Sequence, residues 1–150
     1  MRHIRSAGLV LLLVLMGGCA VPPAAAPPPS ASLYDRLGGY NAIAGVTDDF
    51  LARLGSDAQF ARFFGRTTPD QLHVLRQHLV EQLCQAAGGP CFYTGRPMRA
   101  VHVGMHITEA EWNAAAGHLV AALDRFHVPP AEKTQVIAFV VSQKPDIVGQ

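Results

Sequence analysis

The stretch GGPCFYTGRPMRAVHVGMHIT, residues 88–108, decides how the rest of the chain is interpreted. It holds two histidines four residues apart, His102 and His106. Histidines at that spacing on one helix share a face and can bind one metal ion. Thr108 and Glu111, however, form a capping box that predicts a new helix, which leaves His106 in the turn before it. A glycine between the two histidines also weakens a continuous helix. The sequence therefore favours His102 alone as a candidate ligand over a two-histidine zinc site.

The surroundings of His102 suggest what it could bind. Met98, Val101 and Met105 place soft, apolar side chains around it, and an upstream segment carries a stripe of leucines. A flat apolar cofactor with one axial imidazole would suit such a pocket. A lone histidine on an apolar helix can equally be an ordinary core or surface residue. The local pattern alone leaves both interpretations open.

The chain from Leu33 to its C-terminus predicts helices and no strands, because apolar residues recur every three or four positions without strict alternation. A short helix is expected over Met98–Val103, and a final helix after a Val-Pro-Pro break at residues 128–130. Gly55 is expected to stop an earlier helix. Side chains that can cap helix starts stand at Ser32, Asn41, Ser56, Thr68 and Thr108. The expected fold class is all-α.

The first 32 residues do not belong to this domain. Arg2 and Arg5 precede a short apolar run that ends in Gly-Gly-Cys, so residues 1–18 are expected to be a signal peptide. Cys19 stands where a bacterial lipoprotein carries its lipid, and residues 19–32 form a proline- and alanine-rich tether. The domain then spans residues 33–150. The expected location is outside the cytoplasm, in the periplasm or on the outer membrane, anchored by lipid at Cys19. Ordinary cleavage that releases a free protein is the alternative.

Charge and cysteine content narrow the possible partners. The chain has 12 basic and 11 acidic residues. Loss of Arg2 and Arg5 with the signal peptide leaves ten bases against eleven acids. No basic stripe is present, so nucleic acid is not an expected partner. In an oxidising compartment Cys84 and Cys91 could form a disulfide. Two separate buried thiols remain the alternative.

Several motifs, in one order along the chain, resemble the truncated haemoglobins, most closely their first group. These are LYDRLGGYNAI (33–43), DDF (48–50) followed by FF (63–64), the stretch 88–108, and HLVAALDRFHVP (118–129). The resemblance implies a shortened globin fold, in which two helices pack over two others with haem b between them. It implies a haem protein that binds a diatomic gas, O2, NO or CO.

The resemblance also assigns expected roles to individual residues. His102 matches the proximal ligand of the haem iron. Phe64 matches the phenylalanine that stacks on the haem, with Phe63 as its close rival. Arg99 could pair with the haem propionates, although a solvated arginine is the alternative. The remaining residues expected to line the haem site are Phe50, Leu51, Leu75, Leu79, Leu83 and Met98.

The distal side departs from the family pattern. Leu51 stands where many members have a tyrosine that donates a hydrogen bond to bound oxygen, and Leu75 and Leu79 stand where polar residues are common. A pocket without donors would hold oxygen poorly and still accept CO or NO. His78, 24 residues before His102, could reach the iron as a sixth ligand, which would suit electron transfer or redox sensing with an unknown electron donor. A position at the haem edge or in water is the alternative.

Three functions compete at this level. The first is gas binding or redox sensing by a haem protein. The second is a haem-dependent enzyme, either a peroxidase or a nitric-oxide-consuming protein, for which only His78 offers a distal acid-base group. The third is a haem-free lipoprotein that binds a partner protein. Uptake of haem separates the third from the first two.

Overall fold

The computed structural model describes residues 31–150, and the predictions for the signal peptide, Cys19 and most of the tether lie outside the described residues. The described part is all-helical and contains no strand beyond an isolated bridge between Ile107 and Val148. This confirms the predicted fold class. The elements are α1 (Leu33–Arg36), α2 (Gly39–Ser56), η1 (Ala58–Phe60), α3 (Ala61–Phe64), α4 (Pro69–Ala86), α5 (Met98–His102), α6 (Glu109–Arg125), α7 (Pro130–Gln143) and η2 (Lys144–Asp146).

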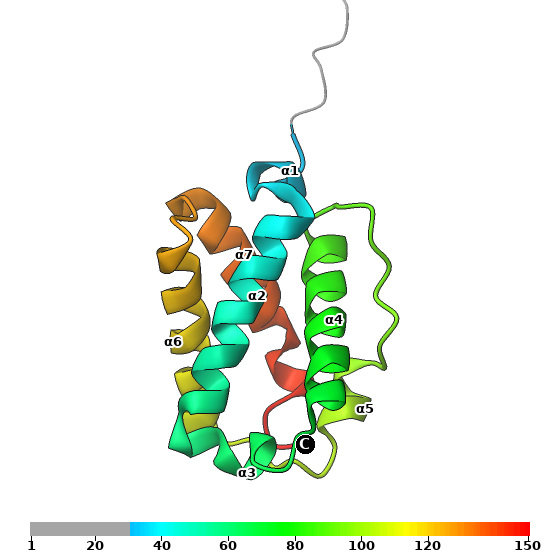
Figure 1. Cartoon of the computed structure of the whole chain (residues 1–150), viewed down its shortest axis with the longest axis vertical. Helices are drawn as coiled ribbons and strands as arrows, with labels where there is room; N and C mark the ends of the chain where they lie inside the picture. Colours follow the sequence, from blue (N-terminus) through cyan, green and yellow to red (C-terminus); the bar gives the residue numbers. More distant parts are fainter. Residues whose placement is uncertain (1–30) are drawn as a thin grey trace, which may run out of the picture.

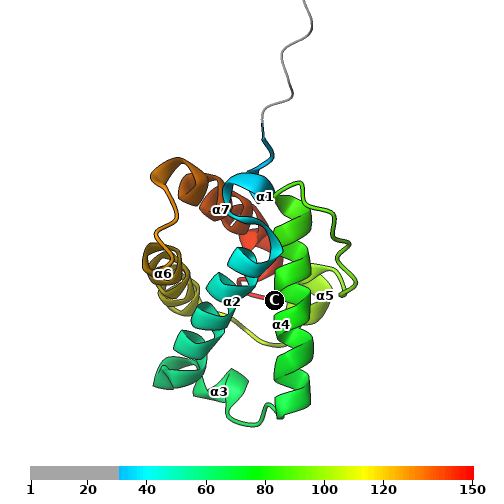
Figure 2. The same cartoon turned by 45° about the horizontal axis from the view of Figure 1, so that its top comes forward.

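The four long helices form the body of the domain. Helix α2 packs against both α4 and α6, which flank it on either side, and α7 lies behind it (Figure 1). Figure 2 shows the same flanking from a raised view, with the short α3 at one end of α2. Within residues 31–150, no helix has the length and apolar character needed to cross a membrane. Residues of α2, α4, α6 and α7 border the interior space that holds the site described below.

The helices are held together by two apolar clusters. The first joins α2, α6 and α7 through Val46, Leu119, Ala122, Leu123 and Val136, and the Leu123 side chain is only 2% exposed. The second joins α2 to α4 through buried residues that include Ile43 and Val80. Burial of such side chains contributes roughly 1.5–3 kcal/mol each relative to exposure. These clusters fix α2 as the central element from which the other helices are positioned.

Three of the predicted helix starts are confirmed. Capping boxes form at Ser32, Thr68 and Thr108, each with its side chain accepting a backbone N–H three residues on. In each box the third helical residue returns a hydrogen bond to the backbone of the cap. The sequence signals for α1, α4 and α6 were therefore sufficient to place their first residues.

Three other boundary predictions are wrong. Helix α2 begins at Gly39, with Gly38 as its N-cap at a φ of 93°, so Asn41 lies inside the helix. The double glycine reverses the chain because only glycine adopts that left-handed conformation easily. Helix α2 also continues past Gly55. Ser56 is its last residue, and Asp57 caps the next turn instead, accepting the Gln59 N–H at 2.9 Å.

Cys84 and Cys91 form a disulfide, which resolves the alternatives left open by the sequence. The bond ties the end of α4 to the loop that precedes α5. The same loop is fastened to α4 by three hydrogen bonds. The Tyr93 N–H donates to the side chain of Gln85 at 2.6 Å, and Thr94 donates twice to Glu81. These links hold the loop along α4, and through it they position α5.

Candidate functional site

A cavity of about 320 Å³ opens between the helices. This lies in the range typical of pockets that bind small molecules and cofactors, about 300–1,000 Å³. Its wall is predominantly apolar. The residues predicted for the site that line it are Phe50, Leu51, Phe63, Phe64, Leu75, Leu79, Leu83, Met98 and His102. The fold thus brings together residues from α2, α3, α4 and α5 that are up to 52 positions apart in the sequence.

His102 presents one ring nitrogen to a potential ligand. It is the last residue of α5, half-buried, and its Nδ1 lies 2.8 Å from the backbone carbonyl oxygen of Met98. A carbonyl can only accept, so Nδ1 carries the hydrogen and donates it. The lone pair of the imidazole is then on Nε2. A hydrogen bond from the other ring nitrogen is the usual way in which proteins orient a metal-binding histidine.

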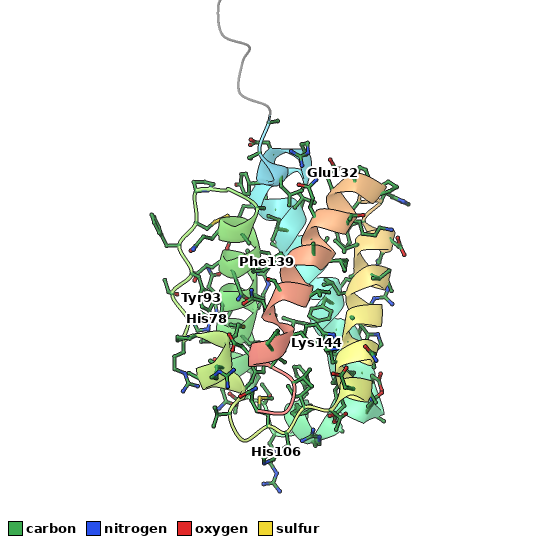
Figure 3. All side chains as sticks on the ribbon, turned by 180° about the vertical axis from the view of Figure 1, so that it is seen from behind. His78, Tyr93, His106, Glu132, Phe139 and Lys144 are labelled. Atoms are coloured by element: carbon green, nitrogen blue, oxygen red, sulfur yellow. A yellow bond between two sulfur atoms is a disulfide. The ribbon has the colours of Figure 1, made fainter. Side chains whose placement is uncertain are left out.

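His106 is separated from His102 as the capping signals predict. It lies in the exposed turn between α5 and α6, with a positive φ of 48° (Figure 3). Its backbone N–H donates to the Gln150 carbonyl at 2.8 Å. The two histidines therefore do not share a helix face.

His78 and Arg99 do not line the cavity, and the haem roles considered for them from the resemblance stay predictions. The His78 ring packs edge-on against Tyr93, with 5.9 Å between the ring centroids, on the side of α4 that faces the loop (Figure 3). It stands one position before Leu79, about 100° round the helix from that residue. Arg99 instead pairs with Asp146 at 3.0 Å. In this arrangement the imidazole of His78 is directed away from the space beside His102.

Several cavity-lining residues were missed by sequence reasoning. Those on α6 and α7 and in the turns around them include Ile107, Trp112, Leu119, Phe139, Val140 and Ile147. Their apolar spacing predicts a core face, and only tertiary packing shows which part of that face borders the cavity. Gln82 was also missed, although its position seven residues after Leu75 returns it to the same face of α4.

An ion pair fixes the turn that follows α5. Arg62 donates to both carboxylate oxygens of Glu111, at 2.8 and 2.9 Å, and also to the backbone carbonyls of Met105 and His106. These hydrogen bonds, with those from Thr108, lower the pKa of Glu111 to about 2. Glu111 is therefore ionised at any physiological pH. The pair joins α3 to the start of α6 and holds the chain on the His102 side of the cavity.

Comparison with known proteins gives a consistent result. The family model described as bacterial-like globin matches residues 32–148. The chain is 37% identical over 117 residues to a group 1 truncated haemoglobin of Mycolicibacterium paratuberculosis, covering 78% of this chain and 84% of that protein. It is also 37% identical over 89 residues to a group 1 truncated haemoglobin of Nostoc commune, covering 59% and 73%.

Solved structures show the same fold. The Fe(III) form of a truncated haemoglobin from Tetrahymena pyriformis superposes with a TM-score of 0.72 at 25% identity, covering 80% of this chain and all of that one. A 2/2 haemoglobin from a Synechococcus species, in the cyanomet state and with covalently attached haem, gives a TM-score of 0.71 at 28% identity, again with 80% and 100% coverage.

Proposed function

The chain belongs to the bacterial-like globin family, whose members bind haem, and we propose that its cavity holds haem b with His102 as the proximal ligand of the iron. The observation that carries the proposal is the hydrogen bond from His102 Nδ1 to the Met98 carbonyl. It leaves Nε2 free at the cavity wall, which is the arrangement a haem ligand needs.

The chemistry of the cavity fits this group. Haem is flat and largely apolar, and the wall offers leucine, phenylalanine and methionine side chains for its faces and edges. Both Phe63 and Phe64 border the space. The Phe63 ring already packs against the Arg62 guanidinium at 3.9 Å and against Phe60. We therefore favour Phe64 as the phenylalanine that stacks on the macrocycle.

The remaining lining residues divide between two roles. All six remaining residues line the cavity: Phe50, Leu51, Leu75, Leu79, Leu83 and Met98. With haem bound, the leucines at 51, 75 and 79 would form an apolar wall beside the gas, and Phe50, Leu83 and Met98 would contact the macrocycle. Bound haem would supply an iron centre with a coordination position for a diatomic gas. The chain's own contribution is to exclude water from that position and to orient the imidazole of His102.

The expected activity is binding of a diatomic gas, O2, NO or CO. The contact between His78 and Tyr93 supports this activity over a redox role in which His78 occupies the sixth position. It equally weakens a peroxidase function, because such an enzyme needs an acid-base group beside the ligand. A gas-binding protein needs no such group.

The visible absorption spectrum of the ferric, ferrous and CO-bound forms tests this proposal. We expect a five-coordinate ferrous form that converts fully to the CO form. A six-coordinate, low-spin ferrous form that disappears in a His78→Ala variant would contradict it, because His78 would then be the sixth ligand. Conversion by CO would also be slowed in that case.

We also propose that the protein is exported and anchored by a lipid at Cys19. The disulfide between Cys84 and Cys91 supports export, because such bonds persist mainly in oxidising compartments. Cell fractionation provides the test. We expect the protein in the membrane fraction and a Cys19→Ala variant released from it. Equal recovery of both in the cytoplasmic fraction would contradict both parts of the proposal.

A further inference from the structure

One polar side chain on α4 faces the cavity. Gln82 lies seven residues after Leu75, almost two helical turns, so the two side chains point in nearly the same direction. Leu75, Leu79 and Gln82 all line the cavity, and the two leucines match the distal positions of the family. Gln82 therefore stands on the wall from which a bound gas would be contacted.

The other hydroxyl and side-chain amide groups of the cavity wall already have hydrogen-bond partners. Thr47 donates to the Ile43 carbonyl at 2.9 Å, and Thr67 donates to the Phe63 carbonyl at 3.3 Å. Gln143 donates to the Ser142 hydroxyl at 2.9 Å. The hydrogen-bonding capacity of these groups is therefore at least partly used within the protein.

The ionisable side chains of the wall are also paired. Glu111 accepts hydrogen bonds from Arg62 and Thr108, and His102 donates to the Met98 carbonyl. The side-chain amide of Gln82, by contrast, has no hydrogen-bond partner among residues 31–150. No buried side-chain nitrogen or oxygen in that range lacks a partner, so the Gln82 amide reaches open space. Gln82 is itself one of the residues that line the cavity.

We propose that the amide of Gln82 donates a hydrogen bond to the diatomic ligand and thereby sets the gas preference of the site. This inference rests on the proposed function, since it needs haem in the cavity. It differs from the prediction from sequence, in which the distal wall offers no donor besides His78. Bound O2 becomes polarised and accepts a hydrogen bond well, whereas bound CO stays nearly neutral and gains less. Gln82 would therefore favour O2 retention over CO.

The test compares haem-loaded wild type with Gln82→Leu. Two quantities are measured: the rate of O2 dissociation and the C–O stretching frequency of the CO form. We expect O2 to dissociate about tenfold faster from the variant, because one net hydrogen bond is lost. We also expect the C–O stretching frequency to rise. Gln77→Leu is the matched control. Gln77 stands on the same helix, outside the cavity wall, with its amide bonded to Glu81, and it should leave both quantities unchanged.

Failure of the inference is distinguishable from failure of the proposed function. Wild type and Gln82→Leu that both bind haem and show equal O2 dissociation rates and C–O frequencies would overturn the role of Gln82 alone. A wild-type protein that takes up no haem would overturn the proposed function and the inference with it. Gln82→Met, which keeps the side-chain length without a donor, decides the question if Gln82→Leu does not fold.

Discussion

Replacing His102 with alanine is expected to weaken haem binding on the order of a hundredfold or more. Loss of a partner outside the metal's own ligands already costs roughly 10–100-fold, and His102 is the proposed ligand itself. The helical content should remain, because α5 is short and the apolar clusters lie elsewhere. Titration with haem followed at the Soret band, together with circular dichroism, measures both effects.

His106→Ala is the control for that variant. His106 is also a histidine of the same stretch, but it lies in an exposed turn and outside the cavity wall. The His106→Ala variant should bind haem with the same affinity as wild type. Added imidazole should restore a five-coordinate spectrum to His102→Ala by filling the vacated position. Unchanged haem affinity in His102→Ala would contradict the assignment of His102 as the iron ligand. Loss of haem affinity in His106→Ala would contradict it as well.

Leu123→Ala is expected to destabilise the fold by about 2–5 kcal/mol, with a fall in melting temperature of roughly 10 °C or more. Leu123 is 2% exposed and packs in the cluster that joins α2, α6 and α7. Removing its side chain leaves a cavity that the surrounding helices cannot close fully. Denaturant unfolding of the haem-free protein isolates this effect from stabilisation by the cofactor.

Val120→Ala provides the comparison on the same helix. Val120 is 36% exposed and should change the free energy of unfolding by well under about 1 kcal/mol. Equal losses in the two variants would mean that the cluster around Leu123 does not hold the helices together in the way its burial indicates.

Local chemistry made much of this fold predictable. Thr68 and Thr108 carry their capping partners three residues on, so a reader of the sequence can place α4 and α6 directly. Gly38 shows the opposite case. Asn41, three residues further on, is a good N-cap by residue type, but the positive φ of the double glycine allows α2 to begin earlier. When two possible helix starts lie this close together, only the backbone conformation of the folded chain shows which one is used.

The site was predictable where resemblance and helix periodicity agree. His102, Leu75 and Leu79 lie on the cavity wall for both reasons. His78 matches a spacing known in the family, yet its side chain packs on Tyr93, a residue of an irregular loop. Sequence spacing fixes where a residue stands on its helix but carries no information on which loop side chain will contact it. Gln82 was not predicted as a site residue, because the apolar stripe of α4 was identified from its leucines alone and a polar residue on the same face does not add to that pattern.

Titration of the purified protein with ferric haem tests the central claim most directly. If the cavity beside His102 is a haem site, the Soret absorbance rises to a sharp breakpoint at one haem per chain and then follows free haem. An absorbance that tracks free haem from the first addition, with no breakpoint and no shift of the Soret band, would contradict the account.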